Sequence, residues 1–367
     1  MKLANLQNLI FQFVVVKSVL VYPPPNPIKF PTSDQQTLIN GDLLTDPLIV
    51  ETVKHVESKV SPKILAIPPS TFIQDSTVTY NAPDPSAAGT CYWAVGQCLR
   101  SSDTSDFQAD ISICKNLNEW GVTYDDGPST QVPGTKELLS ELTSQKLLTT
   151  HFVVGTNVLL YPDLLKQIDA AGHQIGVHSW THHPLTSLSN AQIVAEIKYT
   201  EGIIYKTIGK VPIYFRPPYG DVDDRVRAII SALGYKNVMW TIDSSDTSGI
   251  PNSEVTARMT KVFEGTNPDT NTSLTTGVIT LEHDYLDNTV TSLAALNSYK
   301  TSSKLLKPQP VGQCQGLNSN QWYLNSDGSN PANKSGSTDP SKPNTSHSFK
   351  IQNILFIFTI IIVTFLF

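Results

Sequence analysis

Short β-rich runs alternate with amphipathic segments through the middle of the sequence, and this alternation constrains the fold more than any other feature. The β-rich runs cover residues 120–124, 150–154, 174–177, 213–215, 237–242 and 278–281. Helical patterns lie between them, for example at 134–145, 161–171, 189–209 and 223–233. Strands that alternate with helices over about 200 residues are typical of parallel βα units. We therefore expect an α/β domain over 111–312, closed into a (β/α) barrel slightly short of eight full units.

Composition excludes two classes of protein. The chain has 32 acidic and 26 basic residues, a net charge of −6 and no Lys/Arg cluster, so it lacks the charge that a nucleic-acid binder needs. Long apolar runs occur only at the two ends of the 367 residues, which excludes a protein with many membrane spans. Charged residues make up only 16%, and 25 prolines occur, as is typical of secreted and surface proteins.

Both ends of the chain resemble targeting signals. Residues 1–21 hold an apolar run that Lys17 interrupts, which predicts a signal peptide; an uncleaved anchor is the alternative. Residues 351–367 are apolar and carry no charge after Lys350. A polar spacer and the small triplet Ser335, Gly336, Ser337 precede this tail, which matches a GPI signal, with a simple tail anchor as the alternative. We expect a secreted protein held on the cell membrane by a GPI lipid.

The segments between these signals and the central domain differ from it in composition. Residues 22–110 are Pro-rich at both edges and predict an extended arm with one helical candidate over 47–59. Residues 313–350 are rich in Ser, Asn and Pro; their lack of apolar periodicity from 318 onward predicts a disordered stalk.

Cysteine usage agrees with an oxidising compartment. The four cysteines are Cys91, Cys98, Cys114 and Cys314, and their spacing favours disulfides over a metal site. Four cysteines allow three pairings, and the spacing leaves these open. A bridge from Cys314 would tie the end of the central domain to its beginning. Glycosylation sequons, which fit export, occur at Asn271, Asn333 and Asn344.

Two polar clusters follow predicted strands and suggest a metal site. Asp125 and Asp126 end the first predicted strand, and Gly127-Pro128 follows them and forces a turn. The side chains of two adjacent carboxylates at a strand end point in different directions. One can bind a metal while its neighbour faces a substrate. His178 and His182, four residues apart, have the spacing of a chelating pair if that segment turns helically. Two His and one carboxylate suit Zn²⁺ or another divalent ion that performs hydrolysis.

Three further clusters follow later strands. Arg216 lies at a strand end before two prolines, where it is well placed to pair with a carboxylate. Asp243 and Asp246 follow the next strand, and His283 follows an apolar run. Histidine is well suited to donate a proton near neutral pH. The carboxyl ends of barrel strands carry the active site, so we expect all five clusters to meet there.

Together these clusters resemble a known family. Thr123-Tyr124-Asp125-Asp126-Gly127-Pro128, His178-Ser179-x-x-His182, Arg216-Pro217-Pro218-Tyr219-Gly220, Asp243-x-x-Asp246 and Leu281-x-His283 closely resemble, in order, the five motifs of the polysaccharide deacetylase (NodB-homology) domain, carbohydrate esterase family 4. The resemblance covers about residues 120–290, and the whole chain resembles fungal GPI-anchored chitin deacetylases. It implies a distorted (β/α) barrel of about seven units.

The resemblance also implies a role for each motif residue. Asp126, His178 and His182 would bind a divalent metal, most simply Zn²⁺ or Co²⁺. Asp125 would be the general base and contact substrate, and His283 would be the general acid. Arg216 would orient Asp125, and Asp243 would orient His283. Tyr219, through its backbone N–H, and Leu281 would face the substrate.

The implied activity is hydrolysis of a linear amide C–N bond. The resemblance implies removal of N-acetyl groups from N-acetylglucosamine units of chitin, giving chitosan and acetate, by a monomer in the cell wall. Two alternatives stay open: a deacetylase of another polysaccharide or amide, and a non-catalytic chitin-binding wall protein. One position departs from the family pattern, because Thr247 stands where a Trp that walls the substrate groove is usual.

Overall fold

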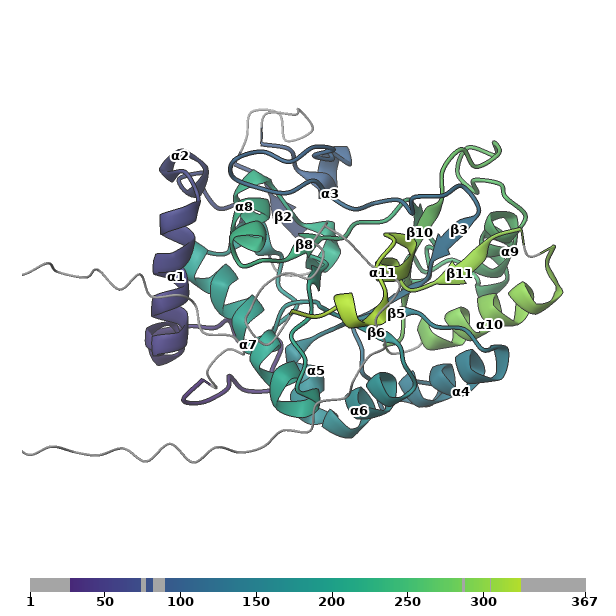
Figure 1. The fold of residues 1–367 in the computed structure, drawn as a ribbon, viewed down its shortest axis with the longest axis horizontal. Coiled ribbons are helices and arrows are strands. Elements are labelled where there is room, and N and C mark those ends of the chain that lie inside the picture. The colour runs from purple at the N-terminus through teal and green to yellow at the C-terminus, as the bar shows by residue number, and fades with distance from the viewer. Residues whose placement is uncertain (1–26, 74–76, 82–89, 286–287, 304, 325–367) are drawn as a thin grey trace, which may run out of the picture. The chain divides into compact units, whose positions relative to one another are not determined.

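Parallel strands form the centre of the computed structural model, which describes residues 27–73, 77–81, 90–285, 288–303 and 305–324 (Figure 1). The strands of the main sheet are β3 (Glu119–Gly121), β4 (Thr123–Asp125), β5 (Thr150–Val153), β6 (Gln174–Val177), β7 (Tyr214–Phe215), β8 (Lys236–Asn237), β9 (Ile242–Asp243), β10 (Val278–His283) and β11 (Lys307–Gln309). Hydrogen bonds join them in the order β11-β3-β10-β4-β5-β6-β7-β8, and β9 pairs with β10. The predicted α/β fold is confirmed. The described strands form an open hydrogen-bonded path from β11 to β8 rather than a closed ring.

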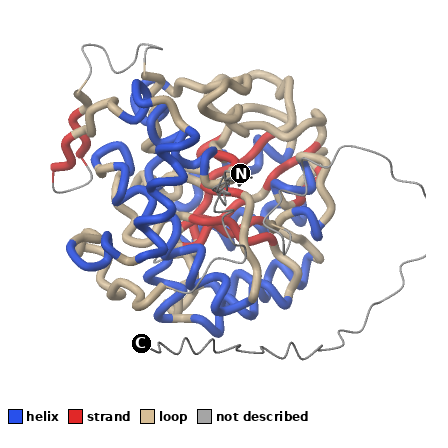
Figure 2. Tube along the Cα trace, turned by 60° about the vertical axis from the view of Figure 1, so that its left-hand side comes forward, coloured by secondary structure: helices blue, strands red, loops and turns tan. Residues whose placement is uncertain are grey.

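Helices surround these strands, as Figure 2 shows. The helices of the barrel region are α4 (Thr135–Gln145), α5 (Gly155–Leu160), α6 (Pro162–Ala170), α7 (Asn190–Ile208), α8 (Asp224–Ala232), α9 (Asn252–Phe263), α10 (Asn288–Thr301) and α11 (Val311–Cys314). The sequence encodes their ends. Ser189 caps α7 by accepting from the Gln192 N–H, and Gly209 ends that helix at φ 69°, a conformation that glycine adopts readily.

Two predicted strands are each divided in the structure. The run 120–124 becomes β3 and β4 because the chain changes partners at Val122: β3 lies between β10 and β11, and β4 lies between β10 and β5. The run 237–242 becomes β8 and β9. The chain changes partners there, because the Val238 N–H donates to the Phe215 carbonyl of β7 and the Thr241 N–H donates to the Ile279 carbonyl of β10. Between these two bonds, the carbonyls of Val238 and Met239 accept hydrogen bonds from Arg216.

The N-terminal segment is packed on the domain, so the expected extended arm is wrong for its described part. Helix α1 (Pro47–Lys59) has the predicted bounds and packs against α7 and α8 (Figure 1). Its apolar residues recur at helical spacing, and Ile49 and Val56 are buried in the same core as those helices. The segment also contains α2 (Pro62–Leu65), the strands β1 (Thr71–Ile73) and β2 (Thr77–Thr79), which pair with each other, and α3 (Trp93–Gly96).

The stalk also begins later than residue 313. The Ile213 N–H donates to the Trp322 carbonyl, and the Leu324 N–H donates to the Val211 carbonyl. Trp322 is 4% exposed, so residues 313–324 are part of the folded domain. The polar composition of residues 313–324 suggested a disordered stalk, and this prediction is wrong because the large Trp322 side chain is buried in the domain.

Two disulfides join the four cysteines. Cys91 bonds to Cys98, and Cys114 bonds to Cys314, 200 residues along the chain. The second bridge ties the end of the domain to its beginning, as predicted. Both of its sulfur atoms lie against Gly121 of β3, where an added Cβ would be 3.2 Å from the Cys114 sulfur.

Several predictions concern parts of the chain outside the described residues. These are the signal peptide (1–21), the stalk beyond 324, the sequons at Asn333 and Asn344, the Ser335, Gly336, Ser337 triplet and the tail (351–367). Within the residues that the structure does describe, none of the helices has the length and apolar character to cross a bilayer.

Candidate active site

The predicted site residues lie at the carboxyl ends of neighbouring parallel strands. Register places His283 at the end of β10 beside Asp125 at the end of β4. Val177 of β6 pairs with Phe215 of β7, so the residues that follow them, His178 and Arg216, also leave the sheet side by side. The sheet therefore delivers four of the predicted residues to one edge.

Asp126, His178 and His182 form a possible metal-binding triad. One ligand atom from each lies within 4.8 Å of the other two. Asp126 Oδ1 is 3.0 Å from His182 Nε2 and 3.3 Å from His178 Nε2. The sequence prediction required residues 178–182 to form a helical turn so that His178 and His182 could share a face, but this segment after β6 is not helical. His182 instead turns back toward His178 because Ser179 and His182 adopt positive φ angles of 63° and 59°.

Both imidazoles are oriented by groups outside the triad. His178 Nδ1 is 2.7 Å from the Arg216 carbonyl, which can only accept, so Nδ1 carries the proton. This tautomer leaves the Nε2 lone pair directed at Asp126. His182 Nδ1 is 3.1 Å from the Tyr219 hydroxyl. A partner on the second ring nitrogen is the usual arrangement for metal-binding histidines.

The triad fits a divalent cation. Asp126 Oδ1 is buried, and among the residues that the structure describes its recorded polar neighbours are these two imidazoles. Burial acts to raise the pKa of Asp126, but when the imidazoles are protonated, the charge of His182 and hydrogen bonds from both rings outweigh burial and hold this pKa well below its usual value. One carboxylate oxygen and two imidazole nitrogens that face a common point are a ligand set with open positions, as Zn²⁺ hydrolases use.

Asp125 lies beside the triad and is held by Arg216. The Arg216 Nη1 donates to Asp125 Oδ1 at 2.9 Å, and the other Asp125 oxygen is 3.8 Å from His178 Nε2. Arg216 is fully buried and stacks over Phe152, with its guanidinium carbon 4.4 Å from the ring centre. Burial lowers the pKa of Arg216, while the charge of Asp125 opposes that shift. The pair fixes the orientation of the Asp125 carboxylate.

His283 is held by Asp246. Asp246 Oδ1 lies 2.8 Å from His283 Nδ1, and Asp246 Oδ2 accepts from the His283 backbone N–H at 2.8 Å. Burial acts to lower the pKa of His283, but the charge of Asp246 and its hydrogen bond prevail and raise the pKa to about 10. Nδ1 faces Asp246, so Nε2 is the ring nitrogen that this carboxylate does not engage.

This contact corrects the sequence prediction that Asp243 orients His283. The Asp243 carboxylate accepts from the Ser245 backbone N–H at 2.7 Å and thus shapes its own turn. The fourth sequence motif contains both Asp243 and Asp246. The presence of a second carboxylate three residues after the first was therefore the sequence feature that could have pointed to Asp246 as the partner of His283. Which of them faces His283 depends on the turn through Ser245, which has a positive φ of 65°.

The remaining predicted residues lie at or near this edge. Tyr219 is 47% exposed, and its ring centre is 4.6 Å from that of His182. Leu281 of β10 is buried and pairs in register with Asp243. Thr247 is exposed directly after Asp246. Asn271 lies apart from them, exposed in the loop after α9.

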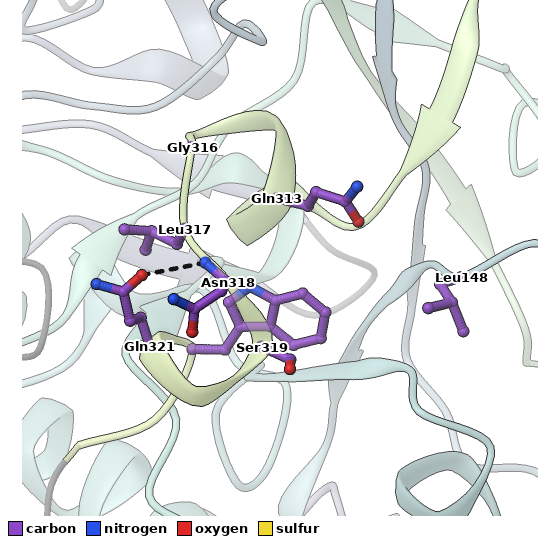
Figure 3. Close-up of a pocket in the computed structure, with 8 residues that line it drawn as sticks. Leu148, Gln313, Gly316, Leu317, Asn318, Ser319 and Gln321 are labelled. Atoms are coloured by element: carbon purple, nitrogen blue, oxygen red, sulfur yellow. Dashed lines mark hydrogen bonds between the residues drawn. The ribbon is translucent and has the colours of Figure 1, made fainter. Parts of the chain in front are cut away.

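A separate pocket, shown in Figure 3, lies near the amino end of β5. Leu148, which precedes β5, lines it together with Gln313, Asn318 and Gln321. It holds none of the predicted catalytic or metal-binding residues, and the chemistry described above does not involve it.

Comparison with known proteins agrees with this arrangement. A sequence profile of the polysaccharide deacetylase family matches residues 113–238. Chitin deacetylase 1 of Cryptococcus neoformans var. grubii is 40% identical over 212 residues, which are 55% of this chain and 43% of that protein. The chitin deacetylase of Amylomyces rouxii is 36% identical over 244 residues, 66% of this chain and 56% of that protein. The chain thus spans about half the length of these curated relatives.

A solved structure shares the fold. The chitin deacetylase from Colletotrichum lindemuthianum superimposes with a TM-score of 0.52 at 28% identity, over 59% of this chain and 95% of that one. Residues 113–238 therefore lie in a polysaccharide deacetylase domain, and the chain is a homologue of fungal chitin deacetylases.

Proposed function

We propose that this protein is a chitin deacetylase, which hydrolyses the N-acetyl groups of N-acetylglucosamine units and yields chitosan and acetate. One observation carries the proposal: the Asp126, His178, His182 triad lies next to a buried Asp125 that Arg216 holds. The names of the relatives supply the substrate class. Hydrolysis of an amide needs a base to activate water and an acid to protonate the amine, and this edge of the sheet offers both.

The triad would hold the divalent cation, with Zn²⁺ or Co²⁺ as the preferred ions for two imidazoles and one carboxylate. When bound, the cation would act as a Lewis acid on the acetamide carbonyl oxygen and lower the pKa of a water molecule. His178 and His182 would bind through Nε2, because their Nδ1 atoms are engaged by Arg216 and Tyr219.

The chain's own residues would move the protons. Asp125 accepts a proton from the attacking water while Arg216 keeps its carboxylate in place. The water oxygen bonds to the acetyl carbon, and the Tyr219 backbone N–H helps to stabilise the negative charge that develops on the carbonyl oxygen. His283 then gives its Nε2 proton to the sugar nitrogen as the C–N bond breaks. Acetate and a free amine leave.

Substrate contacts and location complete the proposal. Leu281 and the exposed Tyr219 would contact the sugar, and Thr247 would leave that side of the groove more open than a Trp would. The two terminal signals support secretion and a GPI lipid on the cell membrane, facing the cell wall. Asn271 is exposed, as a glycosylated residue must be. We expect a monomer.

The test is acetate release from chitin oligomers of several lengths by metal-reconstituted protein, with acetylated xylan as the comparison substrate. We expect release from the chitin oligomers, and none after chelation of the metal. Faster release from acetylated xylan would favour a deacetylase of another polysaccharide. Retention on chitin without any acetate release would favour a wall-binding protein and contradict the proposal.

A further inference from the structure

The metal triad is assembled from two separate segments that adopt costly backbone conformations. Asp126 has a positive φ of 74°, and Ser179 and His182, in the loop after β6, have positive φ angles of 63° and 59°. The left-handed region costs a residue with a side chain about 1–2 kcal/mol, and such strain persists only where surrounding contacts enforce it. Something must therefore hold both segments in place and at the right separation.

Residues 154–157, at the start of α5, contact both segments. On the Asp126 side, the Val154 N–H donates to the Gly127 carbonyl at 3.0 Å, and the Asn157 Nδ2 donates to the Asp126 carbonyl at 2.7 Å. On the histidine side, backbone N–H groups of residues 155 and 156 donate to the carbonyls of residues 179 and 180, at 2.9 and 3.2 Å. Four hydrogen bonds thus join the two ligand-bearing segments through one short stretch.

Of these four hydrogen bonds, only the one from Asn157 has a side-chain donor, and a second hydrogen bond fixes the orientation of that side chain. Asn157 is 4% exposed, and its Oδ1 accepts from Gln35 Nε2 at 3.2 Å. Because Gln35 occupies the oxygen, the amide nitrogen is the atom that faces Asp126. The carbonyl it bonds belongs to the residue that has the positive φ and supplies the carboxylate ligand.

We propose that Asn157 is a positioning residue of the metal site, which fixes the Asp126 backbone in its left-handed conformation, and that Gln35 fixes Asn157. The inference rests on the proposed metal-dependent function. It also gives the N-terminal segment a role, because the same segment reaches the histidine side: the Trp180 Nε1 donates to the Thr32 carbonyl at 3.0 Å, and Phe30 stacks on the Trp180 ring.

The experiment measures the Zn²⁺ dissociation constant of the purified protein by chelator competition, for wild type, Asn157→Ala and Gln35→Ala. Loss of a group that orients a metal ligand typically weakens metal binding about ten- to hundredfold, and we expect this of Asn157→Ala. Gln35→Ala should weaken binding less, because the Asn157 amide remains.

Asn190→Ala is the matched control. The Asn190 Nδ2 donates to the Leu65 carbonyl at 3.0 Å, and its Oδ1 accepts from Arg225, so it has the same pattern of bonds away from the triad. It should lower thermal stability and leave the Zn²⁺ constant unchanged. A wild-type constant in folded Asn157→Ala would overturn the inference. If Asn157→Ala does not fold, Gln35→Ala decides: weaker Zn²⁺ binding supports the inference and an unchanged constant overturns it.

The Zn²⁺-binding experiment can succeed or fail independently of the acetate-release test of the proposed function. Wild-type protein that binds Zn²⁺ and loses affinity on Asn157→Ala, but releases no acetate from chitin oligomers, would support the positioning role while contradicting the proposed activity.

Discussion

Asp125 and His283 each lie buried against one partner of opposite charge, Arg216 and Asp246 respectively. Removal of one member of such a pair leaves the other charge unpaired, which costs about 3–5 kcal/mol in a protein interior. The two groups that would move protons are therefore oriented by their partners, and a change in either partner should affect catalysis without direct contact with substrate.

The pair of His283 and Asp246 predicts a pH effect. The folded pKa of His283, about 10, lies above its ordinary 6.5, so the pair stabilises the fold fully below about pH 6.5 and loses this effect as the pH rises through about 10. Asp246→Asn removes the charge that raises this pKa. We expect the basic limb of the pH profile of kcat to move to lower pH, while Asp243→Asn, the control, leaves it in place. A shift with Asp243→Asn alone would restore the original assignment.

Glu282 offers a second pH effect, in stability rather than activity. Burial, with the charge of Asp246, raises its pKa from 4.5 to about 8. Because the folded pKa is the higher one, this carboxyl favours the fold below about pH 4.5 and loses that contribution as the pH rises toward 8. Glu282→Gln cannot ionise, so its free energy of unfolding in urea should fall less between pH 5 and pH 8 than that of wild type. Equal falls would contradict this account.

At the scale of elements, the strands and helices of the central domain were predictable because the sequence alternates short β-rich runs with amphipathic helical segments. The run 174–177 coincides with β6, and Ser189 and Gly209 form the two caps of α7. The packing of the N-terminal segment was not predictable, since the prolines near residues 23–31 and 62–85, on either side of α1, favour an extended chain. The choice between Asp243 and Asp246 was also out of reach, because a turn with a positive φ decides it.

Helix α1 should therefore behave as part of the core. Ile49 is fully buried, and Ile49→Ala should lower the free energy of unfolding by about 2–5 kcal/mol. Glu51, on the exposed face of the same helix, is the control, and Glu51→Ala should change it by no more than about 0.5 kcal/mol. Chemical denaturation measures both. An Ile49→Ala effect as small as that of Glu51→Ala would return this segment to the status of a loose arm.

At the scale of the whole molecule, the two disulfides close loops of very different length. Loss of the Cys114–Cys314 bridge, with a sequence separation of 200, should cost about 5 kcal/mol on a chain-entropy estimate, and loss of Cys91–Cys98, with a separation of 7, about 2.5 kcal/mol. Paired Cys→Ser variants compared by urea unfolding measure the difference. A larger loss for the short loop would show that strain or local packing, not loop length, sets the effect.

In the proposed mechanism, three side chains would meet on one cation, and Asp125 next to them would act as a base rather than as a ligand. Elemental analysis of wild type, Asp125→Asn and His178→Ala, run alongside acetate release from chitin oligomers, tests this most directly. We predict one equivalent of metal in wild type and in Asp125→Asn, a rate reduced about a hundredfold or more in Asp125→Asn, and no metal in His178→Ala. Full metal content in His178→Ala, or substantial acetate release by Asp125→Asn, would contradict the account.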